Sequence, residues 1–272
     1  MKIFRKIFDF YLDGSIHVAL SCFCLVRISQ YQFNISKDFV MAYFAFFGTI
    51  VGYNFVKFVA LFSDKQTKIQ LKLKGILALS ILSFLGVGFC FFQLQKSTQI
   101  IAIVFLIFTL LYTLPFFPNR KNARNWAGVK IYIVSLCWVG VTLVLPALNA
   151  KIPVAIDFFV QCTQRFILIF VLILIFEIID LAKDDPYLQT VPQQIGLKRT
   201  KILGCGLLLI FCALEIFIQS SNFLSMSLII AIVIAIVILL FLAFANETRS
   251  KYYTSFWVES IPILWCILLL LL

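Results

Sequence analysis

The sequence predicts an all-α integral membrane protein. Two properties of the composition carry this prediction, since 62% of the 272 residues are hydrophobic and only 13% are charged. Soluble proteins are about 45–50% apolar and about 25% charged. The third observation is that the apolar residues form long runs, and each crossing of a membrane needs about 20 of them. We expect nine transmembrane helices in a single domain over residues 1–272, because neither a repeat nor a linker interrupts the pattern.

Residues 1–13 differ from the runs that follow because they mix basic and aromatic side chains. A helix with this composition is typical of the interface between a membrane and the cytoplasm. The residues concerned are Lys2, Arg5 and Lys6 beside Phe4, Phe8 and Phe10.

The nine expected spans are separated by short polar loops. They cover about residues 15–31, 39–62, 75–92, 99–117, 129–148, 157–181, 201–219, 223–245 and 255–272. The fourth is expected to end at Pro115 and Pro118, because the residue before a proline disfavours the helical conformation. The first is the least apolar, since it carries His17 and Arg27. For His17, the single histidine, a packed or hydrogen-bonded role is favoured over that of a base.

Lysine and arginine are unevenly divided between the two ends of the expected helices. Seventeen lie in the N-terminal segment and in the loops that follow the even-numbered spans, whereas five lie on the other side. Because basic loops stay in the cytoplasm, this bias predicts a cytoplasmic N-terminus and, with nine spans, a C-terminus on the far side. The five on the other side are Arg27, Lys37, Lys96, Lys151 and Arg165.

The formal net charge of +11 has the same explanation, and we therefore expect no nucleic-acid partner. The eight cysteines contain no C-x-x-C pair. They are expected to be small buried apolar residues, not disulfides or zinc ligands.

An acidic segment interrupts the apolar run at the end of the sixth span. Glu177, Asp180 and Asp184 stand at i, i+3 and i+7, so they fall within about 60° of one another on one face of a helix. A carboxylate left in hydrocarbon costs roughly 2.5–3.5 kcal/mol, so these side chains are expected to face a cavity or a cation. They suit Mg²⁺, which favours one or two carboxylates together with the phosphates of a substrate. The alternative is a helix that simply leaves the membrane into a charged loop.

This segment resembles the second aspartate-rich motif of the UbiA-type intramembrane prenyltransferases. The family's motif reads D-x-x-D-x-x-x-D and leads through T-x-P and a glycine into the next helix. The corresponding residues here are Glu177, Asp180, Asp184, Thr190, Pro192 and Gly196. The resemblance implies a nine-helix bundle around a central cavity, with acidic motifs at the cytoplasmic ends of helices two and six. The expected spans place the ends of the second and sixth helices on that side.

The first motif of the family, N-D-x-x-D-x-x-x-D, is present only in part. Asn54 matches its asparagine, and it is expected to reach a metal or to hydrogen-bond a neighbouring helix. The positions of the three acids are taken by Phe55, Phe58 and Phe62. Lys57 stands in the same helical turn, and two interpretations of it stay open. It replaces the charge of a missing metal beside a diphosphate, or it neutralises Glu177 or Asp180.

The loop after the fourth span carries further basic residues. The family has Y-x-x-x-K there, and Tyr112 fits this pattern although no lysine stands at the expected place. The nearest substitutes are Arg120 and Lys121, followed by Arg124 and Lys130. The resemblance implies that these residues attract and clamp the phosphates of the substrate.

The function that the resemblance implies is transfer of an isoprenyl group from an allylic diphosphate to a hydrophobic acceptor. In the family, Mg²⁺ stabilises the leaving diphosphate, an allylic cation forms, and an electron-rich acceptor attacks it. The resemblance implies that Glu177, Asp180 and Asp184 hold Mg²⁺, with at least one ion fewer because one acidic cluster is lost. Asn54 and Lys57 would complete the diphosphate end. It also implies a location in the cell (inner) membrane, with the active face toward the cytoplasm.

Two other classes of function stay open. A non-catalytic protein that binds an isoprenoid or another lipid is favoured by the loss of the first motif. A small transporter is less favoured, because no pair of broken helices occurs in matching halves. Glu215 lies within the seventh span, where it serves as either a helix–helix hydrogen-bonding residue or a second functional group.

Overall fold

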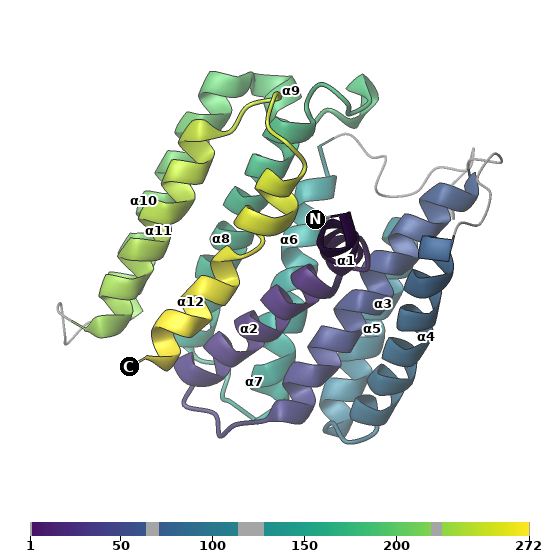
Figure 1. Cartoon of the computed structure of the whole chain (residues 1–272). Coiled ribbons are helices and arrows are strands. Elements are labelled where there is room, and N and C mark those ends of the chain that lie inside the picture. Colours follow the sequence, from purple (N-terminus) through teal and green to yellow (C-terminus); the bar gives the residue numbers. More distant parts are fainter. Residues whose placement is uncertain (1, 64–70, 114–127, 219–224, 272) are drawn as a thin grey trace.

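The computed structural model describes residues 2–63, 71–113, 128–218 and 225–271, and no strand occurs among them. The helices run from one end of the bundle to the other and back (Figure 1). They are α1 (Lys2–Asp13), α2 (Ile16–Gln32), α3 (Phe39–Ser63), α4 (Leu71–Phe91), α5 (Lys96–Thr113), α6 (Lys130–Val139), α7 (Leu145–Asn149), α8 (Ile156–Asp180), α9 (Val191–Ile195), α10 (Leu197–Ile218), α11 (Met226–Phe244) and α12 (Ile261–Leu270). A 3₁₀ turn at Pro186–Leu188 and π-helical turns at Gly140–Val144 and Tyr253–Val258 complete them.

The helices coincide closely with the nine expected spans. Seven helical segments of the described chain are long and apolar enough to cross a membrane. An eighth is formed if α1 and α2, which meet at an angle of 53°, are taken as one span. Since the apolar part of α5, Lys96–Leu110, is shorter, the count of nine and the side of the N-terminus stay predictions.

Helix α8 is the centre of the bundle. In its membrane-spanning part 72% of the residues are buried, a larger share than in the other candidate spans of the described chain. A helix that is apolar on all sides is expected in the interior of a bundle, where every face has a neighbour. Figure 1 shows α10 and α11 on one side of α8 and the layer of α3, α4 and α5 on the other. The end of α8 is therefore held from several sides.

A buried arginine ties the centre of α8 to its neighbours. Arg165 is 2% exposed, and its guanidinium donates to the carbonyl of Leu25 at 3.1 Å and to Ser29 Oγ at 3.2 Å. It also donates to Thr142 Oγ1 at 3.2 Å, in the π-helical turn. The charge pattern of the sequence assigns Arg165 to the loops of the far side, but the structure places it inside the bundle.

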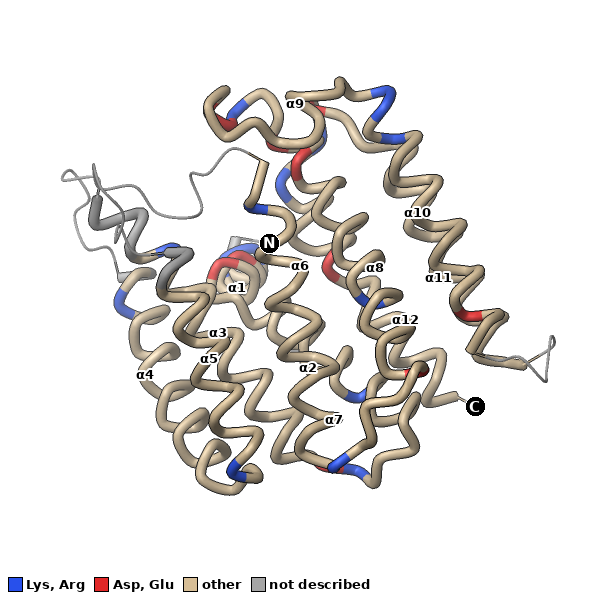
Figure 2. The backbone as a smooth tube through the Cα atoms, turned by 180° about the vertical axis from the view of Figure 1, so that it is seen from behind, with Lys and Arg blue, Asp and Glu red and all other residues tan. Residues whose placement is uncertain are grey.

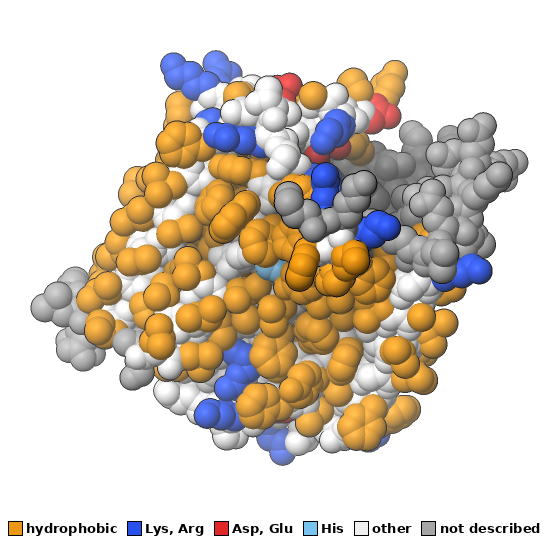
Figure 3. All heavy atoms as spheres, in the orientation of Figure 1, with side chains coloured by type: hydrophobic (Ala, Val, Ile, Leu, Met, Phe, Trp, Pro, Cys, Tyr) orange, Lys and Arg blue, Asp and Glu red, His pale blue; other side chains and the backbone are white. Residues whose placement is uncertain are grey.

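Charged residues lie mainly at the two ends of the bundle, and few occur along the helices between them (Figure 2). Hydrophobic side chains cover most of the face shown in Figure 3, between basic groups above and below. An apolar belt bounded by charged ends is the surface that a bilayer requires. The arrangement supports a multi-pass membrane protein.

Candidate functional site

The acidic segment lies where α8 ends, at the end of the bundle that also carries α9 and the start of α6 (Figure 1). We call this the α9 end. Glu177 is one turn before the end of α8 and is 3% exposed. Asp180 is the last residue of α8, and its carbonyl accepts from the backbone nitrogens of Lys183 and Asp184 at 2.8 and 2.9 Å. These bonds close one further turn beyond α8, which ends at Asp184.

Glu177 acts as a cap for α9. Its Oε2 accepts a hydrogen bond from the backbone nitrogen of Val191, the first residue of α9, at 3.0 Å. The first backbone N–H groups of a helix have no partner within it, and a carboxylate at this position satisfies one of them. The side chain of Gln193 accepts from the nitrogen of Thr190 at 2.9 Å and closes the same turn. The buried carboxylate therefore has a structural partner.

Two other predicted site residues lie close to this carboxylate. Lys130, the first residue of α6, and Asp184 are both near enough to interact electrostatically with Glu177. Asp180 is different, because its side chain is 49% exposed and lies 3.7 Å from Lys183. The α9 end thus combines a lysine and two carboxylates, with Asp180 at the rim.

Asn54 and Lys57 lie near the end of α3, where they bind the corner between α1 and α2. Buried Asn54 accepts from Ser15 Oγ at 2.8 Å and donates to the carbonyl of Gly14 at 3.2 Å. It also donates to Ser80 Oγ on α4 at 3.0 Å. The expected hydrogen bond to a neighbouring helix is therefore confirmed for Asn54.

Lys57 reaches the same corner. Its Nζ donates to the carbonyl of Asp13 at 3.0 Å and to Ser15 Oγ at 2.8 Å. The Asp13 carbonyl belongs to the last turn of α1, where a cation is favourable for the helix dipole. Ser15 itself has a left-handed backbone conformation (φ 62°). Lys57 thus stabilises a strained turn, while its predicted contact with a diphosphate stays a prediction.

The remaining predicted phosphate-binding residues are not placed. Arg120, Lys121 and Arg124 lie outside the described residues, and Tyr112 lies in the last turn of α5 with its side chain outside the description. Lys130 is the member of this group that the structure brings to the acidic segment.

A polar cluster around His17 was not found from the sequence. His17 is 3% exposed, and its ring bonds the hydroxyl of Tyr11 at 2.7 Å, the carbonyl of Phe256 at 2.9 Å and Ser260 Oγ at 3.0 Å. These partners come from α1 and from the segment before α12. The packed, hydrogen-bonded role of the histidine is confirmed. No sequence signal indicates its partners, because Phe256 and Ser260 are more than 200 positions away.

Comparison with known structures identifies the fold. A UbiA homologue from Aeropyrum pernix K1 in its apo form superposes with a TM-score of 0.71 over 94% of this chain and 98% of its own, at 14% identity. A UbiA homologue from Archaeoglobus fulgidus bound to GPP and Mg²⁺ gives 0.61 over 95% and 97%, at 13% identity. The chain has the UbiA fold. A digeranylgeranylglyceryl phosphate synthase gives 0.58 over 98% and 96%, at 14% identity.

No family model and no curated protein sequence matches the chain. The resemblance read from Glu177 to Gly196 is thus confirmed at the level of the fold, by structures too distant in sequence to carry more.

The acids in the described part of this UbiA-fold chain do not assemble a three-ligand metal site. Among the described residues, no group of three or more histidine, cysteine, aspartate or glutamate side chains is arranged to hold an ion. One carboxylate oxygen of Glu177 is hydrogen-bonded to the first residue of α9, and the half-exposed side chain of Asp180 lies beside Lys183. The roles of Glu177, Asp180 and Asp184 as ligands of Mg²⁺ therefore stay predictions.

Proposed function

We propose that this protein is a membrane prenyltransferase, which transfers an isoprenyl group from an allylic diphosphate to a hydrophobic acceptor. One observation carries the proposal: in a UbiA fold, Lys130, Glu177 and Asp184 meet at the end of the central helix. The known structures with this fold include one bound to GPP and Mg²⁺ and a digeranylgeranylglyceryl phosphate synthase. Their ligands and activity support the substrate class proposed here.

The proposed roles follow from charge. Lys130, with Arg120, Lys121 and Arg124, binds the diphosphate, because ammonium and guanidinium groups form strong hydrogen bonds to phosphate oxygens. The bond between the allylic carbon and the bridging oxygen breaks, and its electron pair leaves with the diphosphate. The acceptor then forms a bond to the allylic cation and loses a proton. Glu177 positions α9 above this end through its bond to Val191.

We place the reaction at the α9 end, on the cytoplasmic side of the cell (inner) membrane. The excess of lysine and arginine in the loops at this end supports the orientation. We further propose that residues 1–272 form one UbiA-like unit. The superpositions, which cover 94–98% of the chain, support this.

A second candidate function has its own supporting observation. Asn54 and Lys57, at the end of α3, are engaged by Ser15, Gly14 and Asp13. The first acidic cluster is replaced by phenylalanines, and the remaining polar residues stabilise the corner between α1 and α2. This combination suits a non-catalytic protein that binds an isoprenoid or another lipid.

The test is release of diphosphate by the purified protein in lipid nanodiscs. Geranyl, farnesyl and geranylgeranyl diphosphate serve as donors and a total membrane lipid extract as the source of acceptors, with Mg²⁺ or with a chelator. If the protein is a prenyltransferase, the wild type should release diphosphate and the Lys130→Met variant should not. Release of diphosphate with Mg²⁺ but not with the chelator would indicate that the acidic side chains bind a metal ion. An inactive wild type that carries a co-purified isoprenoid would favour the second candidate. A wild type with neither diphosphate release nor a bound isoprenoid would refute both candidate functions.

A further inference from the structure

A pocket lies at the end of the bundle opposite α9. It encloses about 360 Å³, and its walls are the ends of α2, α8, α10, α11 and α12. Most of its lining side chains are polar, although the surrounding helices are apolar. The lining residues are Tyr31, Gln32, Asn34, Gln161, Glu215, Ile218, Ser225, Met226, Ser227, Trp265 and Leu269.

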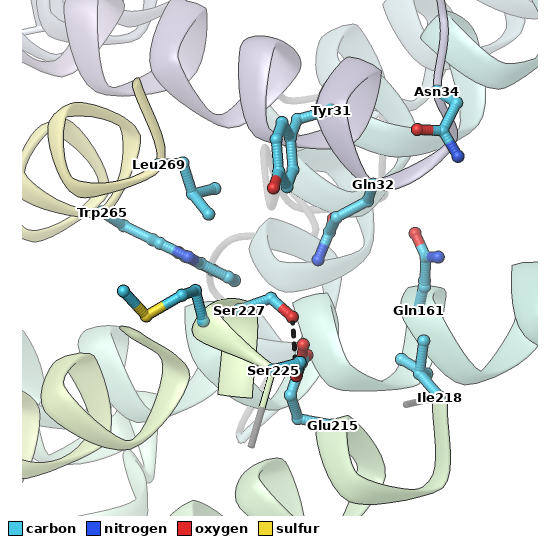
Figure 4. Close-up of a pocket in the computed structure, with 11 residues that line it drawn as sticks. Tyr31, Gln32, Asn34, Gln161, Glu215, Ile218, Ser225, Ser227, Trp265 and Leu269 are labelled. Atoms are coloured by element: carbon cyan, nitrogen blue, oxygen red, sulfur yellow. Dashed lines mark hydrogen bonds between the residues drawn. The ribbon is translucent and has the colours of Figure 1, made fainter. Parts of the chain in front are cut away.

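The polar groups of the pocket converge. In Figure 4, Tyr31 and Gln32 reach from α2 toward Ser225, Ser227 and Glu215 on the opposite wall. Trp265 and Gln161 flank the space between these walls. A set of polar side chains that meet from several helices inside an apolar bundle is the usual form of a small-molecule site.

Two buried acceptors line this space, and one of them has no donor. Gln161 is 4% exposed, and within the described chain its Oε1 has no hydrogen-bond partner. Glu215 is also 4% exposed, and its Oε2 accepts one bond, from Gln164 Nε2 at 2.8 Å. Glu215 thus fulfils the helix–helix role expected from the sequence, yet it also lines the pocket. An unpaired buried oxygen costs about 1–3 kcal/mol, so Gln161 favours a ligand that brings an N–H donor.

The charge of the pocket has one sign. Among its lining residues in the described part of the chain, Glu215 alone carries a formal charge. Arg165 is not a lining residue, but its guanidinium contacts two residues that are: it donates to Gln32 Oε1 at 3.2 Å and lies 5.7 Å from the ring of Trp265. Because the Gln32 oxygen is engaged by Arg165, its amide nitrogen is the group turned into the pocket (Figure 4). The pocket therefore offers a carboxylate and a carbonyl to a cation, and an amide and hydroxyls to an oxyanion.

We propose that this pocket binds a primary ammonium group next to a phosphodiester, as in an aminophospholipid headgroup. The ammonium contacts Glu215 and Gln161, and the phosphate lies toward Gln32 and the serines. Its position supports a lipid, since the pocket lies at the end of α2, where half-exposed Tyr31 is of an aromatic type enriched at the membrane interface. This site is separate from the α9 end, so it does not depend on prenyl transfer.

Native mass spectrometry of the purified protein with equal amounts of three short-chain lipids tests this proposal. Phosphatidylethanolamine should be retained about tenfold more than phosphatidylcholine, which has no N–H donor, or phosphatidylglycerol, which has no cation. Equal retention of the three would overturn the assignment. If free ethanolamine competes as well as the lipid, the ammonium site stands, but its ligand is a soluble amine and not a lipid headgroup.

Variants give an independent measurement. Glu215→Gln keeps an acceptor for Gln164 and removes the charge, and Gln161→Leu removes the second acceptor, so each should abolish the preference for phosphatidylethanolamine. The matched control is Glu247→Gln, an exposed carboxylate beyond the other end of α11, which should keep the preference. An unchanged preference in Glu215→Gln would refute the site. If that variant fails to fold, the three-lipid comparison on the wild type decides.

Discussion

The ends of α3 and α8 bring polar residues to the same end of the bundle, and these residues have different surroundings. On α3, Asn54 and Lys57 are bonded to the turn at Asp13–Ser15. On α8, one carboxylate oxygen of Glu177 accepts a hydrogen bond from α9, and Lys130 is near enough to interact electrostatically with the same carboxylate. We infer that the end of α3 has become part of the scaffold, whereas the end of α8 is where a charged substrate binds.

The largest effect is expected at Asn54. Asn54→Leu removes three hydrogen bonds and leaves the Gly14 carbonyl and Ser15 Oγ without this partner. We expect the free energy of unfolding in detergent to fall by roughly 2–4 kcal/mol. The control is Gln93→Leu, just beyond the end of α4, whose exposed side-chain amide donates to the carbonyl of Phe89 in that helix. Equal stability of the two variants would mean that the α1–α2 corner does not depend on α3.

Glu177 should show a smaller effect, and its size should depend on the replacement. Glu177→Leu removes the acceptor of the Val191 N–H group, which we expect to cost about 1–2 kcal/mol. Glu177→Gln keeps an acceptor, so its stability should lie closer to the wild type. Thermal unfolding of both variants measures the difference. Equal losses would show that charge, and not capping, is the contribution of Glu177.

Lys57 tests whether the two regions are coupled. Lys57→Met should lower stability by about 1–2 kcal/mol, because the Asp13 carbonyl and Ser15 Oγ lose their donor. In the double variant with Glu177→Gln, the two effects should add within about 0.5 kcal/mol. A double variant more stable than Lys57→Met alone would instead show that Lys57 neutralises Glu177.

Asp180 is expected to have the smallest effect on stability. Its carboxylate is half exposed and 3.7 Å from Lys183, and exposed ion pairs contribute about 0–1 kcal/mol. Asp180→Asn should therefore change the unfolding temperature little. A clear loss of stability would contradict its place at the rim of the site.

The comparison also shows what the sequence could predict. The positions of the helices were predictable because membrane helices form continuous apolar runs in the sequence, and α8 ends within one residue of the expected position. The acidic segment was found for the same reason, as charges that interrupt such a run. The partners were not predictable. Asn54 hydrogen-bonds Ser15, 39 positions away. Ser15 has a left-handed backbone conformation, which a serine in the sequence does not predict. Glu177 meets Val191 only because the chain reverses between them.

The central claim is that the diphosphate binds at the end of α8 and not at the end of α3. The most direct test is the dissociation constant of geranyl diphosphate for folded wild type, Lys130→Met and Lys57→Met in nanodiscs. We predict that Lys130→Met binds the donor about tenfold or more weakly, the scale of a lost hydrogen bond to a charged group. Lys57→Met should keep the wild-type affinity. Unchanged binding by Lys130→Met together with weaker binding by Lys57→Met would contradict the claim and return the diphosphate to α3.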